Sequence, residues 1–498
     1  MPTRSDKHGE GLQRVFYPGF DGGLNLAVPN ETLPKNELKE ALNVEFSSAI
    51  GAMRVRGGLV WSGRFEHKIK AVVPVIGRKG FLAQRNNMKT AYYFRWNNIW
   101  PVSGTLTSKD GNLSIAAWGD GEYLVASGGK LQKFSDNNVL PNLETITNSP
   151  SQCRYVFVRN GRVGVVTGDD TITFSAVGDC ESWDNDPNDE STGQFIEIGY
   201  KDGMNIVAVV PLSRDLIVFK SPPNEPDKGI IWRITGEFPE WVVLEAAHNT
   251  GTFSQKTVVS VGNDVFYISP SGIATLSSVT DYGEVKTAWP DRKVSNALTN
   301  LLKDTGQLWD LPIKQQLWVL PSENSKQIWV FDYIRGIWTK FEFPFKAIYA
   351  TCVDNLVYFF SNTGDIYELN DGYIQDDLYE DGKQDIEAKL RLGTLLTGRQ
   401  TLIKGAYASF ELYPKCSAEL ILGDFHMLFK SNGEADYIYD APNDEQYASE
   451  DDDALFPDGG VLTSRRKCIV REWAIMPEIK IVGGGCSIST LGFEMVEV

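Results

Sequence analysis

The feature that most constrains the fold is a two-strand phrase that recurs along the chain. Residues 264–276 (DVFYISPSGIATL) and 355–369 (NLVYFFSNTGDIYEL) share a polar residue, a β-branched and aromatic run, a Ser-x-x-Gly turn and a second short alternating run. This order is typical of strand, tight turn and strand. Looser copies stand at 121–134, 160–174 and 215–220. Recurrence of four-strand material every roughly 40 to 50 residues predicts the blades of a β-propeller.

The pattern allows the blades to be placed along the chain. The first begins near Ile69, and its strand-like segments are separated by glycine and asparagine turns. Six to eight blades fit the pattern, and seven fit it best. The seventh is short of strands, so a distant segment could complete the ring, and the sequence leaves open which segment does so. The later blades are expected at residues 113–146, 152–195, 204–247, 257–287, 308–343 and 347–369.

Two further regions flank the propeller, which is predicted over residues 63–373. Residues 1–62 form a leader that is not blade-like. Apolar and charged residues alternate over 374–498, which predicts a small antiparallel sheet or sandwich. Within it, residues 434–460 form an acidic loop, too polar to pack and long enough to project. The predicted fold class is all-β: an irregular β-propeller of about seven blades with an additional antiparallel β-sheet or sandwich domain.

Two short helices are also predicted. Pro34 opens a helical phrase with Leu38, Ala41 and Leu42 on one face. Between residues 292 and 303, apolar residues recur at i, i+3, i+4, i+7 and i+8, which predicts a second helix. We interpret this second helix as an insertion between blades.

The charge of the chain argues against one class of function. The 498 residues carry a net charge of −17, and the isoelectric point is about 4.9. A protein that grips nucleic acid by its phosphates presents a basic surface, so such gripping is not expected here. No run approaches the roughly 18 apolar residues of a membrane helix, and the start of the chain lacks the apolar core of a secretory signal. We therefore expect a soluble chain.

Residues suited to enzymatic chemistry are sparse. The six cysteines stand far apart and there are only four histidines, so free thiols in a reducing compartment are expected, and a disulfide framework or a zinc site is not. The sequence has no Gly-x-Ser-x-Gly motif and no phosphate-binding Gly-x-x-x-x-Gly-Lys-Ser/Thr motif. We expect no catalytic residue, no cofactor and no enzymatic activity.

Two local patterns have both a functional and a structural interpretation. Residues 184–190 (DNDPNDE) place oxygens as a calcium loop would, but the glycine at the sixth place and the distal glutamate are missing, so a solvated turn is favoured and no metal is expected. Trp318, Trp329 and Trp338 could stack sugars, but the Leu, Val and Phe around them favour core packing.

Two arginines share one face of a predicted strand. Arg54 and Arg56 stand two apart within residues 51–58, so their side chains point the same way. They could meet an acidic partner or a carboxylate of a neighbouring subunit. Exposed strand charges without a partner are an equally good interpretation.

Several segments resemble the tail tubular, hub and nozzle proteins of short-tailed bacteriophages. The resemblance lies in the style and order of these segments over most of the chain. A strand domain that closes the chain is a further point of resemblance. The segments that carry the resemblance are 17–26 (YPGFDGGLNL), 33–34 (LP), 40–45 (EALNVE), 51–58 (GAMRVRGG), 328–339 (IWVFDYIRGIWT) and 365–369 (DIYEL).

The resemblance implies a structural protein of the virion. It implies a homohexameric ring, the tail nozzle or hub, below the portal and adaptor rings, with a central channel that conducts and gates genome ejection. The leader and the C-terminal sheet would combine into a platform that touches the adaptor. The implied place is the virion tail, assembled in the cytoplasm of the host bacterium.

The implied partners are further copies of this chain and the portal-adaptor ring protein, with tail fibre or tailspike and needle proteins as additional candidates. Viral double-stranded DNA would pass through the channel without specific binding. Duplex DNA carries a negative charge per roughly 1.7 Å of its axis, so an acidic wall lets it slide. Arg54 and Arg56 are the candidates for adaptor or inter-subunit contact. The candidate channel-lining residues are Asp440, Asp444, Glu445, Glu450, Asp451, Asp452 and Asp453.

Two alternatives come from other functional classes. One is a host-glycan-binding or glycan-cleaving propeller, with aromatic residues stacking a sugar in a groove at the top of the blades. The other is an intracellular propeller that recruits peptides. The blades lack a regular Trp-Asp pattern and are followed by an extra sheet, which argues against the second alternative.

Overall fold

The structure is a computed structural model of the chain, and it describes most residues between 12 and 497. The residues outside the description are 1–11, 18, 48–50, 76, 79, 96, 111, 120, 137–139, 187, 283–288, 324, 354–355, 414, 424, 431–459 and 498.

The chain forms two compact units, and each unit is discontinuous in sequence. The first, called here the terminal unit, consists of Met1–Val60, Trp329–Glu342 and Leu369–Val498. The second, the propeller unit, consists of Trp61–Ile328 and Phe343–Glu368.

Short antiparallel strands rich in β-branched and aromatic residues make up the propeller unit. In β21 (Asp215–Ser221), every residue after the first is buried, as expected for a strand covered on both faces. The first two sheets are β8 (Ile69–Val75), β9 (Gly80–Arg85), β10 (Ala91–Arg95) and β11 (Asn98–Pro101), then β12 (Ser114–Gly119), β13 (Glu122–Ala126), β14 (Gln132–Asp136) and β15 (Pro141–Thr145). The next two are β16 (Arg154–Arg159), β17 (Arg162–Val166), β18 (Thr171–Phe174) and β19 (Gln194–Glu197), then β20 (Asn205–Leu212), β21, β22 (Ile230–Thr235) and β23 (Val242–His248).

Three more sheets follow in the same unit. The fifth is β24 (Val258–Val261), β25 (Asp264–Ser269) and β26 (Gly272–Thr275), and the sixth begins with β27 (Gln307–Leu311) and β28 (Gln316–Leu320). The seventh contains β31 (Ala347–Val353), β32 (Leu356–Ser361) and β33 (Asp365–Asn370). The short 3-10 helices of this unit are η2 (Pro226–Lys228), η3 (Gln255–Thr257) and η5 (Pro312–Lys314).

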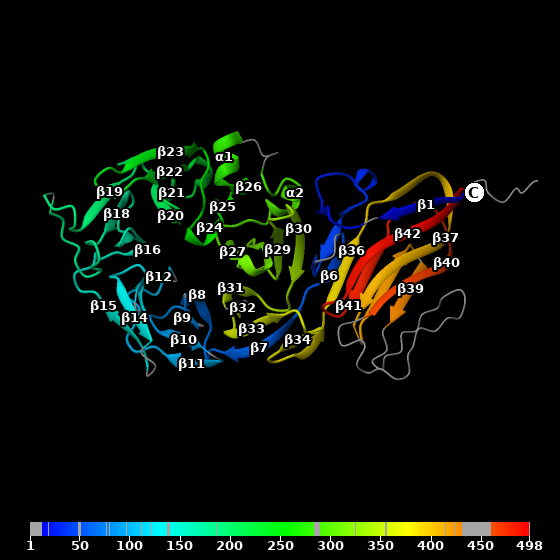
Figure 1. Cartoon of the computed structure of the whole chain (residues 1–498), viewed down its shortest axis with the longest axis horizontal. Helices are drawn as coiled ribbons and strands as arrows, with labels where there is room; N and C mark the ends of the chain where they lie inside the picture. Colours follow the sequence, from blue (N-terminus) through cyan, green and yellow to red (C-terminus); the bar gives the residue numbers. More distant parts are fainter. Residues whose placement is uncertain are drawn as a thin grey trace, which may run out of the picture. The chain divides into compact units, whose positions relative to one another are not determined.

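The first strand of each sheet lies on the inside of a closed ring (Figure 1). Each inner strand contacts the inner strand of the next sheet, in the order β8, β12, β16, β20, β24, β27 and β31, and β31 returns to β8. The predicted β-propeller is therefore confirmed, with seven blades.

A strand from the leader completes the last blade. β7 (Gly58–Arg64) pairs with β33 and becomes the outermost strand of the seventh sheet. At the end of β7, Arg64 Nε is 3.5 Å from Oδ1 of Asp365, the first residue of β33. β7 is thus the distant segment that the sequence left unidentified.

Apolar side chains fill the spaces between adjacent blades. Phe81 and Phe94 of the first blade pack with Phe360 of the last, and the ring centroids of Phe81 and Phe360 are 4.8 Å apart. Ile172 of the third blade and Val218 of the fourth belong to one buried cluster. Burial of these apolar side chains holds neighbouring blades face to face.

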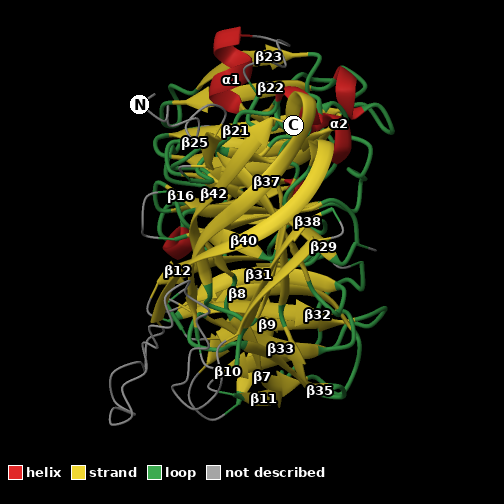
Figure 2. Cartoon of the chain, turned by 90° about the vertical axis from the view of Figure 1, so that its right-hand side faces the viewer, coloured by secondary structure: helices red, strands yellow, loops and turns green. Residues whose placement is uncertain are grey.

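Leader strands and late strands of the chain are interleaved in the terminal unit. One sheet runs in the order β40 (Gly460–Ile475), β37 (Leu395–Leu412), β42 (Ser487–Glu497), β6 (Met53–Val55) and β5 (Val44–Phe46), with β1 (Leu12–Tyr17) paired to β42. In the other, β4 (Glu40–Leu42) lies between β30 (Ile337–Glu342) and β36 (Glu387–Arg391), and β41 (Glu478–Val482), β38 (Ser417–Leu422) and β39 (Phe425–Lys430) follow. The long strands β37, β40 and β42 lie side by side in antiparallel pairs (Figure 2). The predicted additional antiparallel sheet domain is confirmed.

The strands of the terminal unit are short in the leader and long near the end of the chain. The leader supplies β1 (Leu12–Tyr17), β2 (Gly23–Leu24), η1 (Asn30–Thr32), β3 (Glu37–Leu38), β4 (Glu40–Leu42), β5 (Val44–Phe46) and β6 (Met53–Val55). The later segments supply β29 (Gln327–Asp332), β30 (Ile337–Glu342), β34 (Gln375–Leu378), β35 (Gly382–Asp385), β36 (Glu387–Arg391), β37 (Leu395–Leu412), β38 (Ser417–Leu422), β39 (Phe425–Lys430), β40 (Gly460–Ile475), β41 (Glu478–Val482) and β42 (Ser487–Glu497).

The predicted helix after Pro34 is wrong, because this segment forms β3 and β4. Ala41 is buried and β4 pairs on both of its sides, so hydrogen bonding to neighbouring strands overrides the local helical spacing. The predicted helix over 292–303 is present but short, as α2 (Ser295–Leu298). A further helix, α1 (Leu276–Tyr282), begins where the sequence indicated the end of a strand.

Two general features of the described residues complete the fold. The five cysteines whose side chains are described are free thiols, four of them buried. Over the same part of the chain, the helices are too short and too polar to cross a membrane.

Candidate functional site

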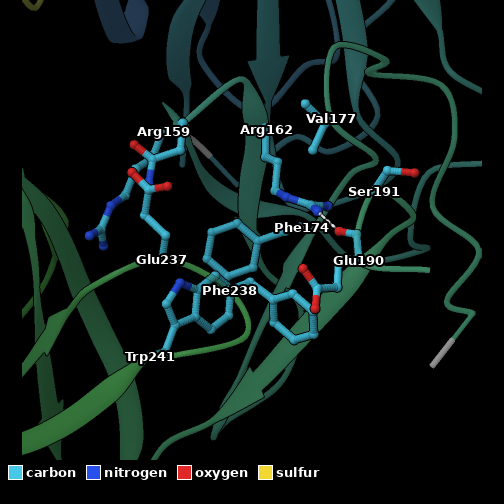
Figure 3. A pocket seen from close by; sticks show the side chains of 10 residues that line it. Arg159, Arg162, Phe174, Val177, Glu190, Ser191, Glu237, Phe238 and Trp241 are labelled. Carbon is cyan, nitrogen blue, oxygen red and sulfur yellow. Dashed lines mark hydrogen bonds between the residues drawn. The ribbon is translucent and has the colours of Figure 1, made fainter. Parts of the chain in front are cut away.

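A pocket of about 280 Å³ lies between the third and fourth blades of the propeller unit (Figure 3). The hairpin that joins β16 to β17 supplies one side, and the loop between β22 and β23 supplies another. The residues that line the pocket are Arg159, Asn160, Arg162, Phe174, Val177, Glu190, Ser191, Glu237, Phe238 and Trp241.

A tight turn sets the position of the two arginines. Asn160 and Gly161 both have positive φ angles, 51° and 70°, which a two-residue type I′ hairpin requires. The turn places Arg159 directly opposite Arg162 in the β16–β17 ladder. Two like charges opposite each other are unfavourable, so each guanidinium needs a partner elsewhere.

Arg162 finds its partners in the backbone of the loop that follows β18. Its Nη1 donates hydrogen bonds to the carbonyl oxygens of Ser175 (2.7 Å) and Thr192 (2.5 Å), and its Nη2 donates to that of Glu190. Burial lowers the pKa of Arg162, and nearby Asp189 opposes this shift. An arginine retains its charge even so, and the buried guanidinium therefore holds the loop in place over the pocket.

Arg159 connects the third blade to the fourth. Its Nη2 donates hydrogen bonds to the carbonyl oxygens of Gly236 (2.9 Å) and Arg214. Burial lowers the pKa of Arg159, while the carboxylates of Asp215 and Glu237 oppose this shift. The side chain thereby fixes the start of the loop that carries the aromatic wall of the pocket.

Three aromatic rings form that wall. Phe174 is buried at the end of β18, and its ring centroid is 4.8 Å from that of Trp241 at a tilt of 51°. Phe238 meets Trp241 edge to face, with centroids 5.6 Å apart. Trp241 and Phe238 are half-buried, so part of their ring surface faces the pocket.

Two carboxylates complete the pocket. Glu190 and Glu237 are exposed, and Figure 3 shows them on opposite sides of the aromatic rings. The two carboxylates balance the two guanidinium groups among the lining residues. The pocket therefore offers both donors and acceptors of hydrogen bonds beside an aromatic surface, and polar or charged residues are the majority of its lining.

A second cavity of about 300 Å³ lies where the inner strands converge. Its lining includes Lys70 of β8, Tyr155 of β16 and Lys256 of η3. Burial lowers the pKa of Lys256, nearby Lys70 lowers it further, and Glu323 opposes both effects. Leu113, Tyr155 and Ile348 supply its apolar lining, and tryptophan is not among its lining residues.

The acidic residues predicted to line a channel cannot be placed. Asp440, Asp444, Glu445, Glu450, Asp451, Asp452 and Asp453 all lie outside the described residues. Their role stays a prediction from the sequence.

The two predicted contact arginines have different environments. Arg54 is partly exposed, and its Nη2 lies 3.2 Å from Glu45 Oε1 and 2.9 Å from Asp371 Oδ2. Arg56 is buried, and its two terminal nitrogens bind both carboxylate oxygens of Asp376 at 2.9 and 2.7 Å. The guanidinium of Arg56 is therefore used inside the terminal unit, whereas a contact of Arg54 with another subunit stays a prediction.

The other sequence candidates have structural roles. Trp318, Trp329 and Trp338 are at most 2% exposed, so the predicted core packing is confirmed. In the 184–190 segment, Asp186 Oδ1 accepts a hydrogen bond from the backbone N–H of Asn188. Among the described residues, no group of three or more His, Cys, Asp or Glu side chains is placed to hold a metal ion.

The pocket between the third and fourth blades was not predicted from the sequence. Its residues come from two blades and are spread over about 80 positions, so no local motif contains them. The only local signal was the Asn160-Gly161 turn, which the sequence presents as an ordinary hairpin.

Comparison with known proteins yields similarities of architecture alone. No family model and no curated protein matches the chain. Among solved structures, the WD40 β-propeller domain of Doa1 aligns with a TM-score of 0.40 at 12% identity, over 65% of this chain and 98% of that chain. BamB from Moraxella catarrhalis aligns with a TM-score of 0.37 at 12% identity (66% and 93%), and virginiamycin B lyase from Staphylococcus aureus with 0.40 at 11% (63% and 98%).

Proposed function

We propose that this chain is a structural protein of a short-tailed bacteriophage virion, the subunit of a tail nozzle or hub ring below the portal and adaptor. The observation that carries the proposal is the composition of the terminal unit, in which leader and C-terminal strands are combined. The resemblance in the sequence implies this combination for a platform that docks on an adaptor.

The interleaving of the terminal unit is extensive. β6 pairs with β42, with Met53 opposite Ile488. In the second sheet, Leu42 of β4 lies opposite Lys340 on one side and Lys389 on the other. A unit built in this way is a single folded body, as a docking platform requires, and neither end of the chain could form it alone.

The charge of the chain supports the role of a conduit. A net charge of −17 per subunit, repeated around a homohexameric ring, repels DNA phosphates and lets the genome slide without specific binding. In this proposal Asp440, Asp444 and Glu445, with Glu450 and the three aspartates after it, line or narrow the exit. The role is mechanical and electrostatic, and it involves no catalytic step.

The proposal places the chain in the virion tail after assembly in the bacterial cytoplasm. Its partners are five further copies, the portal-adaptor ring protein and the DNA in transit, with tail fibre or tailspike and needle proteins as additional candidates. Arg54 is the residue proposed for contact with the adaptor or a neighbouring subunit.

The test is the mass of the full chain, alone and mixed with the portal-adaptor complex of the same virus, by light scattering and negative-stain imaging of the same fractions. A ring with an open centre, formed alone or on the adaptor, supports the proposal. An Arg54→Glu variant should weaken ring formation or docking, while Lys228→Met, at an exposed ion pair of the propeller unit, should change neither. A chain that stays monomeric and does not bind the adaptor would refute the proposal.

A further inference from the structure

We propose that the pocket between the third and fourth blades binds a neutral carbohydrate, with a sugar ring stacked on Trp241 beside Phe238 and its hydroxyl groups held by Glu190, Glu237 and Asn160. This function goes beyond the conduit role and does not depend on ring assembly.

The aromatic wall is suited to one face of a sugar ring. Trp241 packs against two neighbouring rings, Phe174 at 4.8 Å and Phe238 at 5.6 Å between centroids, so its indole is held in one orientation. A pyranose presents a flat face of C–H groups, which gains by covering aromatic surface that water would otherwise contact. The braced indole requires little ordering when the ligand binds.

The polar groups around the wall suit hydroxyl groups. Glu190 and Glu237 are acceptors on opposite sides of the rings (Figure 3), and Asn160 supplies both a donor and an acceptor. A sugar hydroxyl can donate and accept at once, so several of them can use this mixed set.

The charges of the pocket favour a ligand without net charge. Arg159 and Arg162 balance Glu190 and Glu237, so an anion and a cation each meet both attraction and repulsion. The guanidinium of Arg162 already donates to three backbone carbonyls, and that of Arg159 donates to two. Neither arginine therefore presents the free fork that binds phosphate or carboxylate in bidentate fashion.

The size of the pocket limits how much of a glycan it can hold. A volume of about 280 Å³ is at the lower end of the range for small-molecule sites, so the pocket suits one or two sugar units. A longer glycan would extend from the pocket into solvent.

The test is saturation-transfer NMR with the full chain and a panel of methyl glycosides. The neutral probes are those of glucose, galactose, mannose and N-acetylglucosamine, and the charged probes are those of glucuronic acid and glucosamine. We expect at least one neutral glycoside to bind at millimolar concentration, with saturation strongest on the C–H protons of one face. Trp241→Ala should weaken this binding at least tenfold, and Glu237→Gln should weaken it several-fold.

Two controls keep the outcome interpretable. Phe195→Ala removes an aromatic side chain of the third blade that is 55% exposed and lies outside the pocket lining, so it should leave binding unchanged. Glu237→Gln alters only an exposed group, so it serves as the test if Trp241→Ala does not fold. Three results would overturn the proposal. They are that no neutral glycoside is saturated at about 10 mM, that only the charged glycosides bind, or that Trp241→Ala and Glu237→Gln both bind as tightly as the unaltered chain.

Discussion

Arg56→Met should loosen the leader from the rest of the terminal unit. Both partners of the Arg56–Asp376 pair are almost fully covered, with side-chain exposures of 2% and 5%. The substitution keeps the apolar stem and removes the charge, which leaves the Asp376 carboxylate buried with the backbone N–H of Leu59 as a remaining donor at 3.0 Å. Breaking a buried pair in this way costs about 4 kcal/mol.

The loss can be measured as local opening of the leader strands. A cost of about 4 kcal/mol predicts roughly 10³-fold faster hydrogen exchange of protected amides in β5 and β6, because each 1.4 kcal/mol is a factor of ten. Mass spectrometry of peptides from these strands would show the change, while β21 in the propeller unit should exchange as before. An Arg56→Lys variant keeps the charge but loses the fork, and should show a smaller acceleration.

A second pair of variants tests the cause. Replacing Arg56 by Met and Asp376 by Leu together should cost less than about 2 kcal/mol, because no unpaired charge is left in the interior. Lys228→Met removes a pair whose side chains are 60% and 53% exposed, and should change little. An acceleration below about tenfold in Arg56→Met would refute the reasoning, since the pair would then contribute no more than a surface contact.

Three further predictions concern the propeller unit. Lys220 Nζ is buried within 2.6 Å of Asp170 and 2.8 Å of Asp202, so Lys220→Met should cost about 3 kcal/mol, and adding Asp170→Asn and Asp202→Asn should restore most of it in denaturant unfolding. Burial raises the pKa of Asp170, but hydrogen bonds from Lys220 and the backbone of Lys201 lower it more, so its net shift is downward. The stability due to Asp170 is therefore present above its unfolded pKa of about 3.9 and is lost as the pH falls through its lower pKa in the folded state. Thermal melts of Asp170→Asn and the unaltered chain from about pH 5 to about pH 2 would check this. Burial raises the pKa of Asp310 to about 6, so folding is penalised as the pH rises through that value, and Asp310→Asn should raise the melting temperature at about pH 8 and not at about pH 4.

The repeated two-strand phrase predicted the propeller well because its information is local. Residues 264–276 contain β25 and β26, and residues 355–369 contain β32 and nearly all of β33. In each case a Ser-x-x-Gly turn and its flanking β-branched or aromatic residues determine the hairpin without help from distant residues. Two clear copies and three looser ones, in order along the chain, are enough to indicate the ring.

Features that depend on distant residues could not be predicted in this way. Strand alternation indicated that Arg56 points out of its strand, but its partner Asp376 is 320 positions away and turns an apparent surface charge into a buried one. The pairing of β4 on both sides converts a helix-like phrase into a strand for the same reason. The pocket at Trp241 depends on how two blades pack, which no single segment encodes.

The position of β7 has a consequence for folding kinetics. β7 and β33 pair although they are about 300 residues apart in sequence, and β1 pairs with β42 near the other end of the chain. During synthesis the early blades can form locally, but the ring cannot close until β33 has been made, and the terminal unit cannot be completed until β42 has been made. Until then the edge of β7 and the leader strands that pair with late strands remain open to wrong pairing. A chain truncated within its last hundred or so residues should therefore aggregate more readily than one carrying any single substitution discussed above.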